Sequence, residues 1–308
     1  MNDYLLFVLG VIAAGVGGEF FVRGAVGLAK WARIPAGIIG ATIAAFATSS
    51  PELAIAINAS LDGTPQIALG DALGANIVNI SLILGIALLI SVIKVPRDIA
   101  RRDIPVAVAG PLLLAIFVMD GEVSRFEGTL LLLVFLGWIY FVLRHVRKKR
   151  SETTVEILGE HRRWLTIVSV VAGLGLLVLA GELVVSGAKG IAATYGMDEF
   201  VIGATVVAIG TTMPELATVI ISKIKGHDEV GIGTILGSSI FNSYWILSVA
   251  ALIEPIGPLP LKELAVVLGF AVITAALTVP GRYGKLGRGR GLILVLLYIT
   301  YLVAVLTS

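Results

Sequence analysis

The sequence predicts an all-α membrane protein with ten transmembrane helices in two inverted five-helix repeats, and with proline-broken second and seventh helices. The first observation behind this prediction is composition: 57% of the 308 residues are hydrophobic and only 14% are charged, whereas a soluble domain carries about 25% charged residues. Glycine accounts for 36 residues, and small residues let membrane helices approach closely. No cysteine is present, which excludes disulfides and thiolate metal sites.

The second observation is the number of apolar stretches, since a spanning helix needs about 20 mostly apolar residues. The fourth, fifth and tenth stretches are somewhat short, and several others exceed 25 residues, which predicts tilted or kinked helices. The start of the chain shows no basic segment followed by a cleavage site, so the first helix is expected to be retained. The ten stretches are Tyr4–Ala32, Ala36–Leu61, Gln66–Ile93, Ile104–Val118, Gly128–Leu143, Trp164–Ala192, Phe200–Ile224, Val230–Ile253, Leu261–Val279 and Leu292–Leu306.

The third observation is a duplicated register. The segment GEFFVRGAVGLA from Gly18 recurs as GELVVSGAKGIA from Gly181, an offset of 163 residues. Because each half holds an odd number of helices, the second copy enters the membrane from the opposite side, as in the inverted repeats of many secondary transporters. The same offset relates Gly40 to Gly203, Thr48 to Thr211, Pro51 to Pro214, Glu52 to Glu215, Leu53 to Leu216, Gly70 to Gly233, Gly74 to Gly237 and Asn79 to Asn242.

Positive charge predicts the orientation. Of the 23 Lys and Arg residues, 19 fall in the odd-numbered connections, three (Arg125, Lys189 and Lys262) fall in the even ones, and Arg23 lies within the first segment. Since positive loops stay cytoplasmic, both termini are expected outside the cell membrane and the basic 144–163 loop inside. The predicted organisation is a first repeat at 1–143, this linker at 144–163, and a second repeat at 164–308. The motif RHVRKKR is read as a topology signal rather than a nucleic-acid or lipid-regulatory patch.

Each repeat places a proline and a glutamate in the middle of an apolar stretch, in FATSSPELAIAI and IGTTMPELATVI. A proline lacks an N–H and clashes with the carbonyl four residues earlier, so Ala47 and Gly210 are expected to have carbonyls without partners. The residues before the prolines, Ser50 and Met213, are expected to leave helical geometry. Unwound backbone is tolerated in a membrane only where it is buried in protein or lines a wet cavity.

The two glutamates, Glu52 and Glu215, sharpen this prediction, because an ionised side chain at the bilayer centre costs several kcal/mol unless it is paired. Arg23 and Lys189 are too few and lie on the wrong segments to pair with both acids. With free carbonyls and nearby hydroxyls the acids form an all-oxygen cage, which hard cations such as Ca²⁺ prefer. The hydroxyls belong to Thr48, Ser49, Thr211 and Thr212, and Asn79 and Asn242 add amide oxygens at matching positions.

Some residues have a structural interpretation beside the functional one. Asn79 and Asn242 could instead form interhelical hydrogen bonds. A second symmetric acid pair, Glu19 and Glu182, lacks the neighbouring hydroxyl and proline residues. A role at a helix interface or in gating is therefore an alternative to ion binding for this pair. The three histidines, His145, His161 and His227, are expected to be solvated in cytoplasmic loops.

At these motifs the chain resembles the cation/Ca²⁺ exchanger superfamily, and closely the prokaryotic Na⁺/Ca²⁺ exchangers. The resemblance covers both repeats, in GATIAAFATSSPEL…GDALGANIVNI and GATVVAIGTTMPEL…GTILGSSIFNS. It implies a core of the second, third, seventh and eighth segments, with the first and sixth sliding across it. It implies a Ca²⁺ site made by the carboxylates of Glu52 and Glu215 and the carbonyls of Thr48 and Thr211. It further implies flanking monovalent sites and a central polar position, formed by Ala45, Ser49, Thr212, Ala208 and Ser238 and by Asn79 and Asn242 respectively.

The sequence departs from the family pattern at three positions. Ala75 stands where the sodium exchangers usually have a serine, whereas its repeat mate Ser238 is intact. Asn242 stands where some relatives carry an aspartate, so K⁺ cotransport is not expected. Ala47 replaces the usual glycine before the threonine. These changes leave the number and identity of the counter-ions open.

The expected function is Na⁺-driven Ca²⁺ extrusion by alternating access, in which the ions compete for the two glutamates, with no enzymatic activity and no cofactor. The alternative on the same fold is Ca²⁺/H⁺ antiport: two carboxylates in a low dielectric repel once the metal leaves, so protons can replace Na⁺. An intramembrane hydrolase is disfavoured because no aspartate pair in a protease context is present, and a passive channel would show a Ca²⁺ current without counter-ion dependence. The expected partners are these ions and the lipid bilayer, with no nucleic acid and no protein partner, and the protein is expected to function as a monomer.

Overall fold

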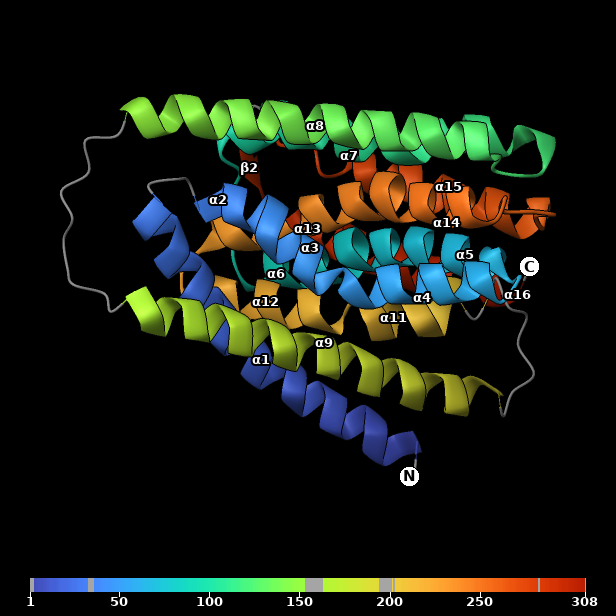
Figure 1. The fold of residues 1–308 in the computed structure, drawn as a ribbon, viewed down its shortest axis with the longest axis horizontal. Helices are drawn as coiled ribbons and strands as arrows, with labels where there is room; N and C mark the ends of the chain where they lie inside the picture. Colours follow the sequence, from blue (N-terminus) through green and yellow to red (C-terminus); the bar gives the residue numbers. More distant parts are fainter. Residues whose placement is uncertain are drawn as a thin grey trace.

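The computed structural model describes residues 3–32, 36–152, 163–193, 201, 203–281 and 283–307, and nearly all of them are helical (Figure 1). The elements in chain order are α1 (Asp3–Ala32), α2 (Ala36–Ile39), η1 (Gly40–Ala44), α3 (Ala45–Thr48), α4 (Ser50–Leu61), α5 (Pro65–Ile77), η2 (Val78–Leu84), α6 (Gly85–Ile90), β1 (Ile93–Lys94), α7 (Arg97–Phe117), η3 (Val118–Asp120), α8 (Arg125–Glu152), α9 (Arg163–Ala193), η4 (Gly203–Val207), α11 (Ala208–Thr211), α12 (Met213–Ile224), α13 (Asp228–Ile240), η5 (Phe241–Ile246), α14 (Leu247–Ile253), α15 (Leu261–Ala276), β2 (Lys285–Leu286) and α16 (Arg288–Thr307).

The ten predicted apolar stretches each correspond to one helix or to one composite helix. In the described part of the chain, five helices are long and apolar enough to cross a membrane, and two bent pairs raise this number to seven. The stretches that looked short belong to longer helices, because α7, α8 and α16 all continue into charged residues at their ends. Residues 144–152 of the predicted linker are therefore helical, as part of α8.

The two proline-containing helices are bent, as predicted, by 43° between α3 and α4 and by 48° between α11 and α12. The break falls at Ser49 (φ −85°, ψ 13°) and Thr212 (φ −81°, ψ 4°). The expectation that Ser50 and Met213 leave helical geometry is wrong, because each begins the second helix of its pair. The prolines then stand in the first helical turn, where a missing N–H disturbs no intrahelical bond.

The expectation of partnerless carbonyls at Ala47 and Gly210 is also wrong. Backbone N–H groups at the ends of α3 and α11 bond to these two carbonyls. A tighter turn at the bend satisfies them, which is a common way for a helix to end.

Four π-helical segments recur at matching places, η1 with η4 and η2 with η5. Glycines allow these composite helices to cross at backbone contact. A Cβ on Gly74 would lie 2.4 Å from the carbonyl oxygen of Ala204, and a Cβ on its repeat mate Gly237 would lie 2.5 Å from that of Ala41. The first repeat's α5 therefore crosses the second repeat's broken helix, and the second repeat's α13 crosses the first repeat's broken helix.

Short backbone pairings show the same symmetry outside the helices. Strands β1 and β2 pair antiparallel with Ile93 opposite Leu286, and Val123 forms an isolated bridge with Ile256. The offset of 163 residues relates Ile93 to Ile256 and Val123 to Leu286. The two pairings are therefore the same contact, formed once by each pair of matching residues. The duplicated register therefore extends at least to Val123 in the first half and Leu286 in the second.

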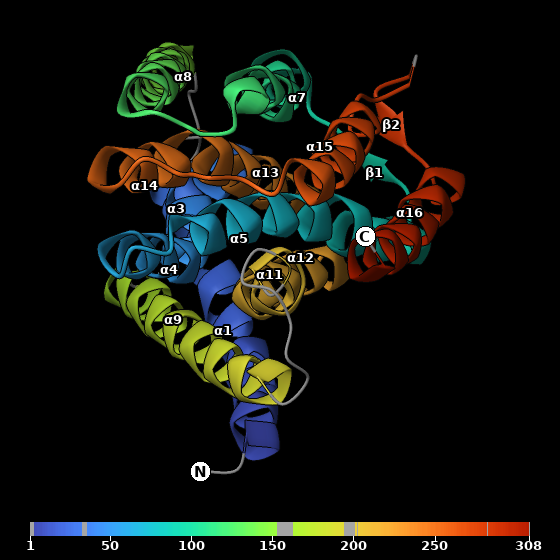
Figure 2. The same ribbon diagram turned by 90° about the vertical axis from the view of Figure 1, so that its right-hand side faces the viewer.

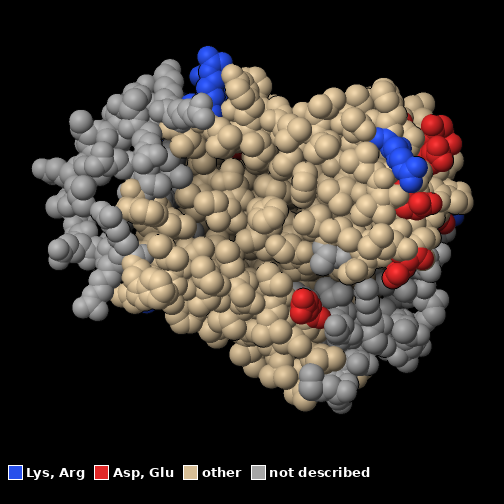
Figure 3. All heavy atoms as spheres, viewed as in Figure 1, with Lys and Arg blue, Asp and Glu red and all other residues tan. Residues whose placement is uncertain are grey.

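The composite helices α5–α6 and α13–α14 run through the centre, and α1 and α9 pack against each other on one side (Figures 1 and 2). One large hydrophobic cluster joins the central and outer helices, whereas Phe21, Ile39, Ala44, Val170 and Leu177 form a separate small cluster between α1, α9 and the core. In the space-filling view the charged side chains gather mainly towards the two ends of the molecule, and a broad belt without Lys, Arg, Asp or Glu separates them (Figure 3). This belt matches a protein surrounded by lipid.

Candidate ion-binding site

The two glutamates of the repeated motif lie in the first turns of α4 and α12, directly after the bends. Glu52 and Glu215 are both 0% exposed. No Lys, Arg or His among the described residues forms an ion pair with either. A buried carboxylate without a basic partner is costly in a membrane, so this position calls for a cation.

The Glu215 carboxylate is held by hydroxyl groups from both repeats. Its Oε1 accepts hydrogen bonds from Ser49 Oγ at 3.2 Å and from Ser238 Oγ at 3.0 Å. The Thr48 hydroxyl lies 3.4 Å from the Ser238 hydroxyl, while Glu215 Oε2 has no hydrogen-bond partner in the described part of the structure. The structure therefore brings three of the other predicted site residues together around one acid.

The Glu52 carboxylate has a different environment. Neither of its oxygens accepts a hydrogen bond from a described residue. The repeat mate of Ser49 is Thr212, whose hydroxyl donates instead to the carbonyl of Ala208 at 2.8 Å. The repeat mate of Ser238 is Ala75, which is buried and has no hydroxyl to donate. The two half-sites thus share a backbone frame but not a set of donors.

The other predicted ligands belong to the helices before the two bends and to two of the π-helical segments. The carbonyl of Ala45 accepts the Ser49 N–H at 2.9 Å, and the carbonyl of Ala208 accepts the Thr212 N–H at 3.3 Å, so both are partly satisfied by the turn. Asn79 and Asn242 are both 0% exposed, and neither amide has a hydrogen-bond partner among the described residues. The structural interpretation of these amides as interhelical hydrogen bonds therefore finds no support in the described structure. Each lies in a π-helical segment, and such segments are frequent at functional sites.

A third acid, Asp71, lies beside this region, and the repeat pattern does not reveal it because its repeat mate is Thr234. Asp71 is 1% exposed and accepts a hydrogen bond from Thr211 Oγ1 at 3.1 Å. The signal that could have found it is simple: a lone acid in an otherwise apolar stretch is by default a functional candidate.

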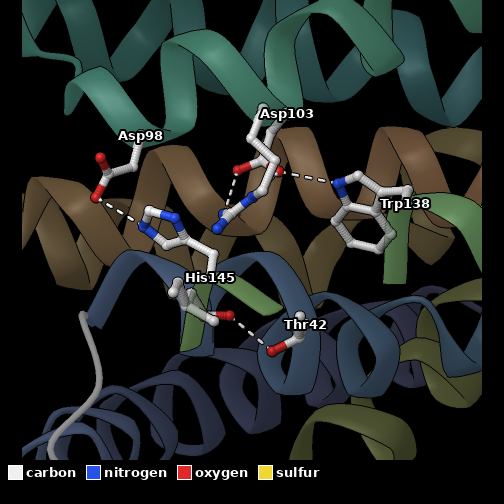
Figure 4. A network of polar contacts seen from close by, with 7 residues as sticks. Thr42, Asp98, Asp103, Trp138 and His145 are labelled. Atoms are coloured by element: carbon white, nitrogen blue, oxygen red, sulfur yellow. Dashed lines mark hydrogen bonds and ion pairs between the residues drawn. The ribbon is translucent and has the colours of Figure 1, made fainter. Parts of the chain in front are cut away.

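A fourth buried acid, Asp103 of α7, shows what structural neutralisation looks like in this protein (Figure 4). Arg102 bonds to both of its oxygens at 2.7 Å, and Trp138 Nε1 donates to Oδ1 at 2.9 Å. Nearby, His145 of α8 lies 3.2 Å from Asp98. The expectation that His145 is solvated in a loop is therefore wrong, since it is half-buried on a helix.

The remaining candidates lie away from the glutamates. Glu19 is exposed on α1 and forms an ion pair with Lys225 at the end of α12, which fits helix-interface work rather than ion binding. Its mate Glu182 is exposed on α9. His227 lies in the loop directly before α13, where its side chain is partly exposed and 3.8 Å from Glu229. His161 and the side chain of Lys189 lie outside the described residues.

Within the described residues, no three His, Cys, Asp or Glu side chains converge into a ready metal cluster. A cation between the repeats would instead be bound by two carboxylates with hydroxyl, amide and carbonyl oxygens, which suits hard cations. Two inverted repeats that each present a broken helix and a buried acid to their interface define the class of secondary transporters.

The chain belongs to the sodium/calcium exchanger protein family, whose pattern matches residues 3–144 and 165–307. It is 33% identical to the inner membrane protein YrbG of Escherichia coli K12, over 94% of this chain and 92% of YrbG. It is 25% identical to the sodium/calcium exchanger MaX1 of Methanosarcina acetivorans, over 98% of this chain and 97% of MaX1. A solved structure of the sodium-calcium exchanger NCX_Mj, soaked with Na⁺ and Ca²⁺, superposes with a TM-score of 0.80 at 29% identity and covers 99% of this chain and 98% of its own.

These findings confirm the predicted fold class and the family resemblance. The protein is a multi-pass membrane transporter of the cation/Ca²⁺ exchanger type and not an enzyme.

Proposed function

We propose that this protein is an antiporter that extrudes Ca²⁺ in exchange for Na⁺. The observation that carries the proposal is the pair of fully buried glutamates, one from each repeat, that no described basic residue neutralises. Two carboxylates balance the charge of one Ca²⁺, and the hydroxyl, amide and carbonyl oxygens around them complete an oxygen shell. Na⁺ is another hard cation that the same oxygens can bind, so the two ions compete for one site.

Competition of this kind is sufficient for exchange. A carrier that holds neither ion keeps two uncompensated acids in a medium of low dielectric, which is costly. It therefore changes conformation far less readily than a loaded carrier. The moving part is the α1–α9 pair, whose described buried contacts with the core form a cluster of their own, made of Phe21, Ile39, Ala44, Val170 and Leu177.

The orientation follows from the positive charge of the connections. With 19 of 23 Lys and Arg residues on one side, both termini lie outside the cell membrane and the 144–163 segment lies in the cytoplasm.

The binding residues in this proposal are Glu52, Glu215, Thr48, Thr211, Ser49, Thr212, Asn79, Asn242, Ser238, Ala45 and Ala208.

The second candidate is Ca²⁺/H⁺ antiport on the same frame. The observation in its favour is the Glu52 half-site, where Ala75 supplies no hydroxyl and no described donor reaches the carboxylate. A site short of Na⁺ ligands leaves a proton as the simplest ion to replace Ca²⁺.

The test is uptake of ⁴⁵Ca²⁺ by proteoliposomes containing the purified protein, driven by an outward Na⁺ gradient at fixed pH. The same vesicles are then given a pH gradient without Na⁺. Uptake driven by Na⁺ supports Na⁺/Ca²⁺ exchange, and uptake driven only by pH transfers the protein to the second candidate. Uptake that needs neither gradient, or that persists in both Glu52→Gln and Glu215→Gln, would contradict a glutamate-based exchanger altogether.

A further inference from the structure

Asp71 places a third carboxylate beside the ion site, on one side of it only. It lies on α5 one helical turn before Ala75, so the two residues share a helix face. The backbone at Asp71 lies at the crossing with the second repeat's broken helix, where a Cβ on Gly203 would come within 3.2 Å of the Asp71 nitrogen. Its side chain is 1% exposed and accepts the Thr211 hydroxyl at 3.1 Å.

The matching position in the second repeat carries no charge. Thr234 donates its hydroxyl to the carbonyl of Val230 at 2.9 Å, within its own helix. On α13, therefore, the hydroxyl of Ser238 reaches the ion site and the side chain one turn earlier does not. On α5 the two positions have the opposite roles. Ala75, which matches Ser238, contributes no hydroxyl, and Asp71, one turn earlier, contributes a carboxylate.

Glu52 supplies the independent evidence that a ligand belongs here. Its side chain is fully buried, and both of its oxygens lack a hydrogen-bond partner among the described residues. Its charge is repelled first by Glu215 and then by Asp71, and the Thr211 hydroxyl, which donates to Asp71 at 3.1 Å, also interacts with Glu52. Two charged carboxylates in a buried position repel each other, and a cation that both of them bind relieves this repulsion.

We propose that Asp71 and Glu52, together with the hydroxyl oxygen of Thr211, bind one Na⁺, and that Asp71 thereby sets how many Na⁺ ions the protein exchanges for each Ca²⁺. This proposal rests on the proposed exchange function and extends it. The carboxylate takes the place of the serine hydroxyl that is absent at Ala75. It also changes the charge balance: Ca²⁺ neutralises two of the three acids, whereas three Na⁺ ions neutralise all of them.

The informative variant is Asp71→Asn, because an amide oxygen can still accept the Thr211 hydroxyl while the charge is lost. Asp71→Thr, which introduces the residue of the matching position, serves as a second variant should the amide disturb folding. Thr234→Asn is the matched control, since it makes a polar change of similar size at the mirrored position outside the ion site.

Two measurements test the proposal. The first is the ratio of ²²Na⁺ efflux to ⁴⁵Ca²⁺ uptake in the same proteoliposomes. We expect it to fall by about one Na⁺ per Ca²⁺ in both Asp71 variants and to stay at the wild-type value in Thr234→Asn. A purely structural role of Asp71 would slow both fluxes and leave their ratio unchanged, which would overturn the proposal.

The second measurement is the rise in Tm of the purified protein on adding NaCl, with KCl and choline chloride as comparison salts. It needs no transport, so it separates failure of this proposal from failure of Na⁺/Ca²⁺ exchange. We expect NaCl to stabilise the wild type and Thr234→Asn more than the Asp71 variants, and the comparison salts to have less effect. Equal stabilisation of all four proteins by NaCl, or none of the wild type, would overturn the Na⁺ site even if Ca²⁺ transport is found.

Discussion

The half-site around Glu215 and the half-site around Glu52 have the same backbone frame and different chemistry. Glu215 accepts two serine hydroxyls, one from each repeat. Glu52 accepts none from the described residues and lies beside Asp71 instead. The bends, the π-helical segments and the glycine crossings are preserved in both repeats, so duplication fixes where the acids stand and leaves their neighbours free to diverge.

This difference indicates that the negative charges of the two glutamates are stabilised in different ways. Hydrogen bonds to a charged group stabilise it by about 1.5–3 kcal/mol, so Glu215 is partly stabilised by the protein itself. Glu52 depends on a bound cation. Variants at matching positions should therefore have unequal effects.

The largest effect is expected from removing either acid. In Glu52→Gln and Glu215→Gln, Ca²⁺ uptake should fall to below about 1% of wild type, because losing a buried charged partner costs about 3–5 kcal/mol, more than 100-fold. Tm without bound ions should separate the two variants. Glu52→Gln should raise Tm more than Glu215→Gln, since it removes the acid that lacks donors. A larger rise for Glu215→Gln would show that the comparison of the two halves is wrong.

A smaller effect is expected from Ser238→Ala, which gives the Glu215 half the same residue that the Glu52 half has at Ala75. Losing a hydroxyl donor at 3.0 Å should raise the Na⁺ concentration for half-maximal Ca²⁺ uptake about ten-fold or more, from about 1.5–3 kcal/mol. The matched control is Ser239→Ala, because Ser239 donates to the carbonyl of Ile235 within its own helix. Equal shifts in both variants would mean that the hydroxyl of Ser238 has no special role.

The reverse change, Ala75→Ser, tests the same comparison from the other side. A serine here can donate to Glu52, so the Na⁺ concentration for half-maximal uptake should fall about two- to five-fold. Ala87→Ser, at another buried alanine of the same composite helix, should leave it unchanged. A rise on adding the hydroxyl would indicate that Asp71 already occupies the position and that the serine crowds it.

The sequence was sufficient to predict features that depend on repetition and on backbone chemistry. The inverted duplication, the bends at the two prolines and the burial of Glu52 and Glu215 all follow from spacing, hydropathy and the missing proline N–H. The bends fall one residue earlier than predicted, at Ser49 and Thr212. The reason is that a proline fits well in a first helical turn, where its missing N–H would have no intrahelical partner.

Other features depend on packing between helices, which no local pattern encodes. The π-helical segments around Asn79 and Asn242 and the direction in which the Thr211 hydroxyl donates are of this kind. Asp71 was missed for a different reason: a search for symmetry finds acids that have an acidic mate, and the mate of Asp71 is a threonine. A search for departures from symmetry would have found both Asp71 and Ala75.

The smallest expected effect concerns a departure at the edge of the α1–α9 pair. Glu19 on α1 forms an ion pair with Lys225 at the end of α12, whereas the mate of Lys225 is Asp62, an acid. The first acid therefore holds α1 against the core, and its mate Glu182 gains no such attraction from the matching position. An exposed pair contributes about 0–1 kcal/mol, so Glu19→Gln should raise the Ca²⁺ transport rate about two-fold, by weakening the conformation in which the pair forms.

The Ca²⁺ concentration for half-maximal uptake should stay unchanged, because the pair lies away from the two glutamates. Glu182→Gln is the matched control and should change neither rate nor affinity. The charge swap of Glu19→Lys with Lys225→Glu should restore the wild-type rate, since it rebuilds the attraction in reverse. A swap that stays at the rate of the single variant would show that the ion pair does not restrain α1.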